Sequence, residues 1–353
     1  MNQAETDKIF QGQRIENTDD FYYWLRYIGA NNGYWPLVNF QKVCISKYRS
    51  KRARESAYVE FDIPKKTGGV RHIVAPNVEL KTVQSCINIL LQTLYEPHEC
   101  ATGFIRGQSV RSNAERHIGS SCMLNLDLKD FFPSITKNMV RRALKEELSE
   151  QIPSAEVRNM ICSLCTLPAP DGTEVLPQGA PTSPVLSNIV LKRLDRRLAA
   201  FAGAHGYNYT RYADDITFSH NRAGRRFSRF FMDKMRAMIE DYGLQINNRK
   251  TRISATGGRM EVTGLTVGDK VNVSRRYIKQ LRTLLHLWEH RGLTEAQQIY
   301  DRDFSNGVHS DLKSVIGGKI NYLTMIRGND DRTATNYAKQ FSKLLHGREC
   351  GYG

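Results

Sequence analysis

YNYTRYADDITFS, residues 207–219, is the stretch that decides the fold of this 353-residue chain. Its two halves are rich in aromatic and β-branched residues, which is typical of strands. They flank Asp214 and Asp215, so we predict a hairpin with the two acids at its tip. Adjacent carboxylates repel each other, and bound divalent cations are one reason for a fold to keep them together.

A third acid stands where an acid is unexpected. Asp127 lies at the end of an almost continuous apolar run, residues 122–128, which predicts a buried central strand. We expect this strand to bring Asp127 to the Asp214–Asp215 tip. Carboxylate oxygens are the ligands that Mg²⁺ prefers, so the three acids are candidate ligands for a pair of Mg²⁺ ions.

The remaining pattern mixes helices and strands without the regular alternation of parallel α/β proteins. Apolar residues at helical spacing predict a helix over 79–95, and a second helix begins near Ser183-Pro184. Residues 225–242 form another expected helix, and the chain from Lys270 onward is mostly helical. The fold class is therefore α+β, with an antiparallel sheet covered by helices on one face.

The charge of the chain points to a polyanionic partner. Lys and Arg number 51 against 36 Asp and Glu, which gives a net charge of +15. The sequence shows no lipidation motif, no signal peptide and no long apolar run, so we expect a cytoplasmic protein without a membrane partner. The seven cysteines are scattered, and Cys162 and Cys165 read as buried thiols rather than zinc ligands.

Four segments together resemble the motifs of reverse transcriptases, in the family's order. They are NLDLKDFFPSI (Asn125–Ile135), LPQGAPTSP (Leu176–Pro184), YADD (Tyr212–Asp215) and LQINNRKT (Leu244–Thr251). Upstream, IPKKTGGVR (Ile63–Arg71) resembles the hairpin that covers the incoming triphosphate in these enzymes. The resemblance implies a right-hand polymerase with fingers, palm and helical thumb.

The resemblance also implies domain boundaries. Residues 1–57 would be a helical lead-in and residues 58–121 the fingers, with further fingers elements around 137–180. The palm would span 122–268, and the thumb with the C-terminal tail 269–353.

Catalytic roles follow residue by residue from the matching positions. Asp127 and Asp214 would be metal ligands and Asp215 the third acid of a two-Mg²⁺ site. Lys250 matches the lysine that assists the departure of pyrophosphate. Asp130 is left out of the metal set because it can pair locally with Lys129 or Lys137.

Deoxynucleotide binding is expected at six matching positions. Phe132 would be the steric gate, whose ring collides with a ribose 2′-hydroxyl. Gln178 and Gly179 would line the sugar and the templating base pair. Arg71 offers bidentate contact to phosphate, and either Lys65 or Lys66 adds positive charge.

Two short patches resemble retron reverse transcriptases in particular. They are Asn113 and His117 in NAERH, and Val262-Thr263-Gly264, a region that the family associates with recognition of its RNA. Each patch could equally be a simple turn. On a predicted helix from Ser274 to His290, a basic stripe would track a duplex backbone, formed by Arg275, Lys279 and Arg282.

Our leading hypothesis is an RNA-directed DNA polymerase that copies part of a cognate structured noncoding RNA. Retron resemblance implies priming from a guanosine 2′-hydroxyl, a branched RNA–DNA product, and an effector protein that acts with it in antiphage defence. One alternative is another bacterial reverse transcriptase, such as a group II intron relative or a different defence enzyme. The other is a catalytically silent scaffold that binds RNA.

Overall fold

The structure is a computed structural model that describes residues 13–34, 45, 47–64, 68–169, 171–222, 224, 226–305 and 310–346. The chain divides into two compact units, each with its own hydrophobic core. The first unit comprises Met1–Gln108, Leu124–Phe218 and Arg226–Arg252, and the second comprises Ser109–Met123, Ser219–Arg225 and Ile253–Gly353. Among the described residues, every helix is too short or too polar to cross a membrane.

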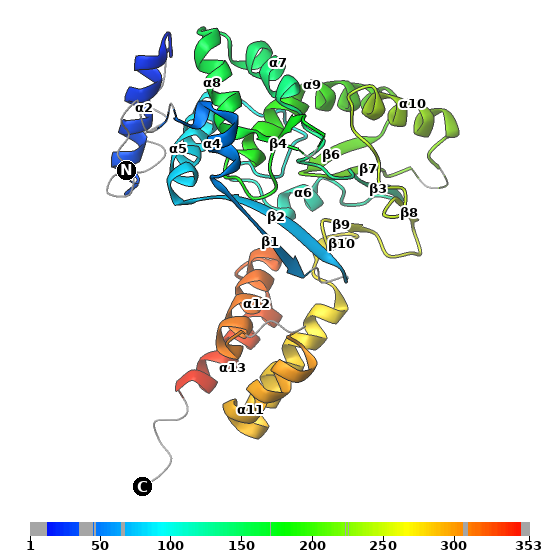
Figure 1. Ribbon diagram of the computed structural model, residues 1–353. Coiled ribbons are helices and arrows are strands. Elements are labelled where there is room, and N and C mark those ends of the chain that lie inside the picture. The colour runs from blue at the N-terminus through cyan, green and yellow to red at the C-terminus, as the bar shows by residue number, and fades with distance from the viewer. Residues whose placement is uncertain are drawn as a thin grey trace. The chain divides into compact units, whose positions relative to one another are not determined.

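The first unit holds most of the secondary structure (Figure 1). Its helices are α2 (Thr18–Asn31), η1 (Lys47–Arg49), α4 (Lys51–Glu55), α5 (Val78–Leu94), α7 (Lys137–Leu148), α8 (Ala155–Cys165), α9 (Ser183–Ala204) and α10 (Arg229–Glu240). Its strands are β1 (Tyr58–Pro64), β2 (Val70–Pro76), β4 (Leu167–Pro168), β5 (Glu174–Val175) and β6 (Asn208–Tyr212). Three strands begin or end in the second unit, namely β3 (Cys122–Asp127), β7 (Asp215–His220) and β8 (Arg252–Ala255).

One sheet, with the strand order β6-β7-β3-β8, gives the first unit its two-sided character. Successive side chains of a strand point to opposite faces. Leu124 and Leu126 of β3 and Phe218 of β7 are buried in the hydrophobic core, where the Phe218 ring packs against Phe231 of α10. The alternate residues, Asp127 on β3 and Asp215 on β7, therefore share the opposite, polar face.

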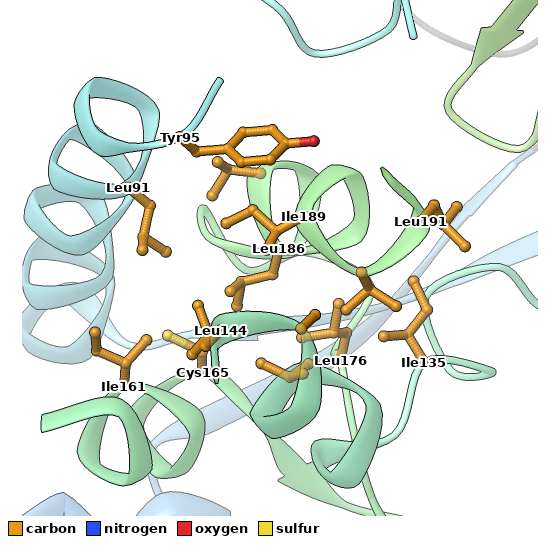
Figure 2. Close-up of a cluster of buried hydrophobic side chains, with 14 of the residues drawn as sticks. Leu91, Tyr95, Ile135, Leu144, Ile161, Cys165, Leu176, Leu186, Ile189 and Leu191 are labelled. Atoms are coloured by element: carbon orange, nitrogen blue, oxygen red, sulfur yellow. The ribbon is translucent and has the colours of Figure 1, made fainter. Parts of the chain in front are cut away.

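Helices build the core beside this sheet. Figure 2 shows Leu186 and Ile189 of α9 between α7, which supplies Leu144, and α5, which supplies Leu91 and is followed by Tyr95. Cys165 of α8 lies in the same apolar cluster, and so does Cys162, which confirms that these two cysteines are buried thiols. Burial raises the pKa of both thiols to between about 11 and about 12, so they stay protonated at neutral pH.

The second unit combines, in its described residues, a small sheet with four helices. The sheet has the strand order β11-β10-β9, and the strands are β9 (Glu261–Val262), β10 (Leu265–Val267) and β11 (Val271–Asn272). The helices are α6 (Val110–Glu115), α11 (Arg275–Asp303), α12 (Leu312–Arg327) and α13 (Arg332–His346). Helix α11 is broken at Gly292, where φ is 75° and ψ is 166°, so it consists of two helical segments joined by a kink.

The predicted elements are largely confirmed, with shifted ends. The α+β class is correct, and the predicted helix over 79–95 is α5. The helix predicted to begin near Ser183-Pro184 is α9, in which Ser183 is the first helical residue and Thr182 takes the capping position; the Ser183 hydroxyl donates to Pro177 O at 2.7 Å. The helix predicted from 225 starts later, since Ser228 accepts a hydrogen bond from Phe231 N and caps α10. The fingers, palm and thumb boundaries stay a prediction.

Candidate active site

Three carboxylates meet at one end of the four-stranded sheet. Asp127 ends β3, Asp215 begins β7, and Asp214 lies in the turn that connects β6 to β7. The backbone joins these segments directly, because Leu128 N donates to Asp214 O at 3.0 Å. The structure thus brings together the three acids that the sequence singled out.

Two of the three carboxylates, Asp214 and Asp215, have raised pKa values. Burial raises the pKa of Asp214, and the charge of Asp127 raises it further. Asp215 is exposed at the surface, yet desolvation by the protein around it and the charges of Asp214 and Asp127 raise its pKa to about 6. Like charges held this close favour the binding of a cation.

The Lys250 side chain places a positive charge next to Asp127. Its ammonium Nζ lies 2.6 Å from Asp127 Oδ1, and Asn247 Nδ2 lies 3.3 Å from Asp127 Oδ2. The hydrogen bond to Asp127 raises the pKa of Lys250, so the side chain is a charged ammonium at neutral pH. Asn247 N also donates to Asp127 O at 2.8 Å, which fixes the segment after α10 along the end of β3.

The donor chemistry of the three acids suits a hard divalent cation, since all the side-chain donors are carboxylate oxygens. In the described residues, however, no group of three His, Cys, Asp or Glu side chains converges closely enough to hold a metal ion. The Lys250 ammonium lies 2.6 Å from Asp127 Oδ1. A cation that binds this oxygen would therefore compete with Lys250.

Aromatic rings line the site beside the acids. The Phe132 ring lies 5.1 Å from Phe131 and 6.2 Å from Phe104, and Phe104 lies 6.5 Å from Tyr212 (ring centroids). Phe132 is only half-buried, so part of its ring remains free to limit what binds next to it. No motif in the sequence points to Phe104, which follows Gly103 in a turn outside the helices and strands.

The β1–β2 hairpin reaches the site through Gln178 and Gly179. Val74 N donates to Gln178 O at 2.9 Å. Gly179 has a φ of 144°, and a Cβ placed there would lie 2.9 Å from Val74 O, so only glycine fits. Arg71, near the hairpin tip, is close enough that its charge offsets a small part of the rise in the pKa of Asp214. Lys65 and Lys66 lie outside the described residues.

Asp130 has the local surroundings that the sequence analysis expected when it left this residue out of the metal set. Its side chain is largely exposed, and its Oδ2 lies 3.9 Å from Lys129 Nζ. The other predicted partner, Lys137, pairs with Glu174 instead.

The two retron-like patches lie in the second unit. Asn113, His117 and Val262 are buried in this structure, and RNA contact at these positions stays a prediction. His117 Nδ1 lies 2.7 Å from Ser219 Oγ, and burial lowers the pKa of His117 to about 4.

The Val-Thr-Gly patch forms the tight turn of a hairpin. Thr263 and Gly264 join β9 to β10, and both have positive φ, 47° and 80°. Gly264 is exposed and Thr263 is half-buried, so these two positions remain predicted RNA contacts.

The predicted basic stripe is present on α11, whose N-cap Ser274 accepts a hydrogen bond from Tyr277 N. Arg275, Lys279 and Arg282 are exposed, while the opposite face buries Leu281, Leu285 and Trp288. Two histidines that the sequence analysis did not include, His286 and His290, continue the stripe with ring centroids 4.0 Å apart.

Comparison with known proteins identifies the family to which the sequence is similar. A family model described as "Reverse transcriptase (RNA-dependent DNA polymerase)" matches residues 63–267. The Retron Mx65 reverse transcriptase of Myxococcus xanthus is 39% identical over 248 residues, which cover 67% of this chain and 57% of that protein. The Retron Ec83 reverse transcriptase of Escherichia coli is 32% identical over 233 residues, which cover 64% of this chain and 74% of that protein. The chain thus spans little more than half the length of the Myxococcus relative.

Solved structures resemble the chain less closely. Telomerase from Candida albicans, in complex with an RNA fragment, has a TM-score of 0.43 and 13% identity, covering 82% of this chain and 63% of that one. A foamy viral protease-reverse transcriptase bound to double-stranded DNA has a TM-score of 0.38 and 13% identity, covering 83% of this chain and 46% of that one.

Proposed function

The chain belongs to the reverse transcriptase family, and we propose that it works as an RNA-directed DNA polymerase of the bacterial retron type. The observation that carries the proposal is that Asp127 and Asp215 share one polar face of the sheet, next to Asp214 in the adjoining turn and to the Lys250 ammonium. The retron relatives support the subclass.

In the proposed reaction a primer hydroxyl attacks the α-phosphorus of a deoxynucleoside triphosphate. A new P–O bond forms, and the bond to pyrophosphate breaks. Asp127, Asp214 and Asp215 would hold two Mg²⁺ ions, which when bound neutralise the charge that develops on the attacking and leaving oxygens. Lys250, once released from Asp127, holds a proton on Nζ that the leaving pyrophosphate can take.

Neighbouring side chains would select and orient the nucleotide. The half-buried Phe132 ring would exclude a ribose 2′-hydroxyl, and Arg71 would bind the triphosphate with its guanidinium fork. Gly179, which has no side chain, lets the backbone approach the nucleotide sugar and base pair closely.

The template would be a structured noncoding RNA. The net charge of +15 and the basic stripe Arg275, Lys279 and Arg282 support binding to a phosphate backbone. Following the retron resemblance, synthesis would start from a guanosine 2′-hydroxyl and leave a branched RNA–DNA product. An effector protein would act with this product in antiphage defence in the cytoplasm.

The test compares wild-type protein with Asp214→Asn on the native transcript, with Mg²⁺ and all four deoxynucleotides. We expect wild type to yield DNA joined to RNA, and Asp214→Asn to lose at least about a hundredfold in rate while still binding the RNA. Asp130→Asn is the matched control, because Asp130 is exposed and pairs only at 3.9 Å with Lys129 among the contacts described. Wild-type protein that binds its transcript but makes no DNA would favour the silent scaffold.

A further inference from the structure

A completely buried ion pair lies behind the active-site turn. Arg211 of β6 has a side-chain exposure of 0% and Asp195 of α9 has 1%. The Arg211 guanidinium donates two hydrogen bonds to the Asp195 carboxylate, from Nε to Oδ1 at 2.8 Å and from Nη2 to Oδ2 at 2.6 Å. The Tyr209 hydroxyl donates a third bond to Asp195 Oδ1 at 2.8 Å.

Stability alone gives a weak reason for such a pair. Removing two charges from water is costly, and a well-packed apolar pair of similar volume is often as stable or more so. A charged pair can do something that an apolar pair cannot, because it leaves a spare hydrogen-bond donor in a fixed position. The spare donor here is Nη1 of Arg211, which lies 3.2 Å from Ala213 O.

Ala213 is the residue of the turn that needs a restraint. It is buried, and its φ of 57° is in the left-handed region that residues with a Cβ avoid. Ala213 directly precedes Asp214 and Asp215, so a change in its φ and ψ angles would move both carboxylates.

The backbone around Arg211 is itself held by the loop that precedes Phe104. Arg211 N donates to Cys100 O at 2.9 Å, and Thr102 N donates to Arg211 O at 2.8 Å. These two hydrogen bonds hold the Arg211 backbone in place, so its side chain can donate to the Ala213 carbonyl from a fixed position.

We propose that Arg211 and Asp195 are positioning residues, which hold Ala213 in its left-handed conformation and so aim Asp214 and Asp215 at the bound cations. Neither residue touches the substrate, and the inference rests on the proposed function. Asp195 orients the guanidinium, and Arg211 transmits that orientation to the turn.

The main variant is Asp195→Leu/Tyr209→Phe/Arg211→Met, which replaces the polar cluster with apolar side chains of similar size and leaves no hydroxyl unpaired. Binding of Mn²⁺ to the protein is followed by the spin resonance of the free ion, and kcat and KM are measured separately. We expect the half-saturating Mn²⁺ concentration to rise at least about fivefold and kcat to fall at least about tenfold, with KM for deoxynucleotides unchanged. Arg54→Met is the matched control, because Arg54 is also buried but bonds to Tyr48 O and Glu174 rather than to the turn.

A folded variant with wild-type Mn²⁺ binding and kcat overturns the proposal. If the triple variant does not fold, the same measurements are made on Arg211→Lys. Lysine keeps the positive charge but has one donor nitrogen in place of the three that Arg211 uses. Ala213→Gly in that background relieves the left-handed strain and should restore Mn²⁺ binding; failure to restore it would also count against a positioning role. Because Mn²⁺ binding needs no catalysis, this test stands apart from the test of the proposed function, which fails only if wild type makes no DNA.

Discussion

Gly103→Ala is the sharpest probe of the active-site turn. Gly103 packs against the backbone that precedes Asp214. A Cβ added to Gly103 would lie 2.5 Å from Ala213 N and 3.0 Å from Tyr212 C. Both obstructing atoms are backbone atoms, so no side chain can rotate away. Ordinary contact begins near 3.4 Å, and the turn and the Gly103 loop must therefore separate by about 0.9 Å.

This displacement sets the expected magnitude. Misplacing reacting groups by about 1 Å can reduce a rate about a hundredfold, and overpacking of this kind destabilises a protein by about 1–3 kcal/mol. We therefore expect Gly103→Ala to fold, to unfold at a lower urea concentration, and to lose about a hundredfold in kcat.

The assay is single-nucleotide extension of a primed RNA template, with urea unfolding of the same preparations. Gly203→Ala is the matched control, because Gly203 lies in α9 with nothing within 4 Å of an added Cβ. This control should keep wild-type kcat, with a stability that is unchanged or higher by less than about 1 kcal/mol. Wild-type kcat in Gly103→Ala would refute the close packing of the loop against the turn.

Three further changes probe other parts of the molecule. Phe132→Val should lower the preference for deoxynucleotides over ribonucleotides at least about tenfold in competitive extension, and an unchanged preference would exclude Phe132 as the steric gate. Lys250→Met should slow nucleotide addition about a hundredfold, because the leaving pyrophosphate loses a proton donor. The same change should tighten Mn²⁺ binding by up to about fivefold, because Asp127 loses its ion pair with Lys250. Weaker Mn²⁺ binding in this variant would contradict competition between Lys250 and the metal. Burial lowers the pKa of His117 from 6.5 to about 4. Between pH 6.5 and pH 4 the unfolded state therefore binds more protons than the folded state, so the free energy of unfolding falls as the pH falls. For this group the fall is at most about 3 kcal/mol. The loss of stability between pH 7.5 and pH 5 in urea unfolding should therefore be smaller for His117→Asn than for wild type, and an equal loss would contradict the buried neutral imidazole.

The buried ion pair shows what sequence reasoning missed and which signal it left. Asp195 follows directly after Leu194 among the buried leucines of α9, and Arg211 lies in a strand otherwise suited to burial. Charged residues are seldom fully buried unless they are paired. Their positions could have suggested two buried charges, but the sequence could not show that each is the other's partner.

Local sequence was enough to predict the main elements and the three acids. Backbone preferences act over a few residues, so an apolar run predicted the strand that Asp127 ends, two strand-like segments predicted the hairpin around Asp214 and Asp215, and helical patterns predicted α5 and α9. The partners of individual side chains became visible only in the folded chain. Lys250 pairs with Asp127, 123 positions away, and the retron-like His117 is buried against Ser219, 102 positions away. Such contacts depend on how whole elements pack, because periodicity encodes the face of an element but not the partner that covers it.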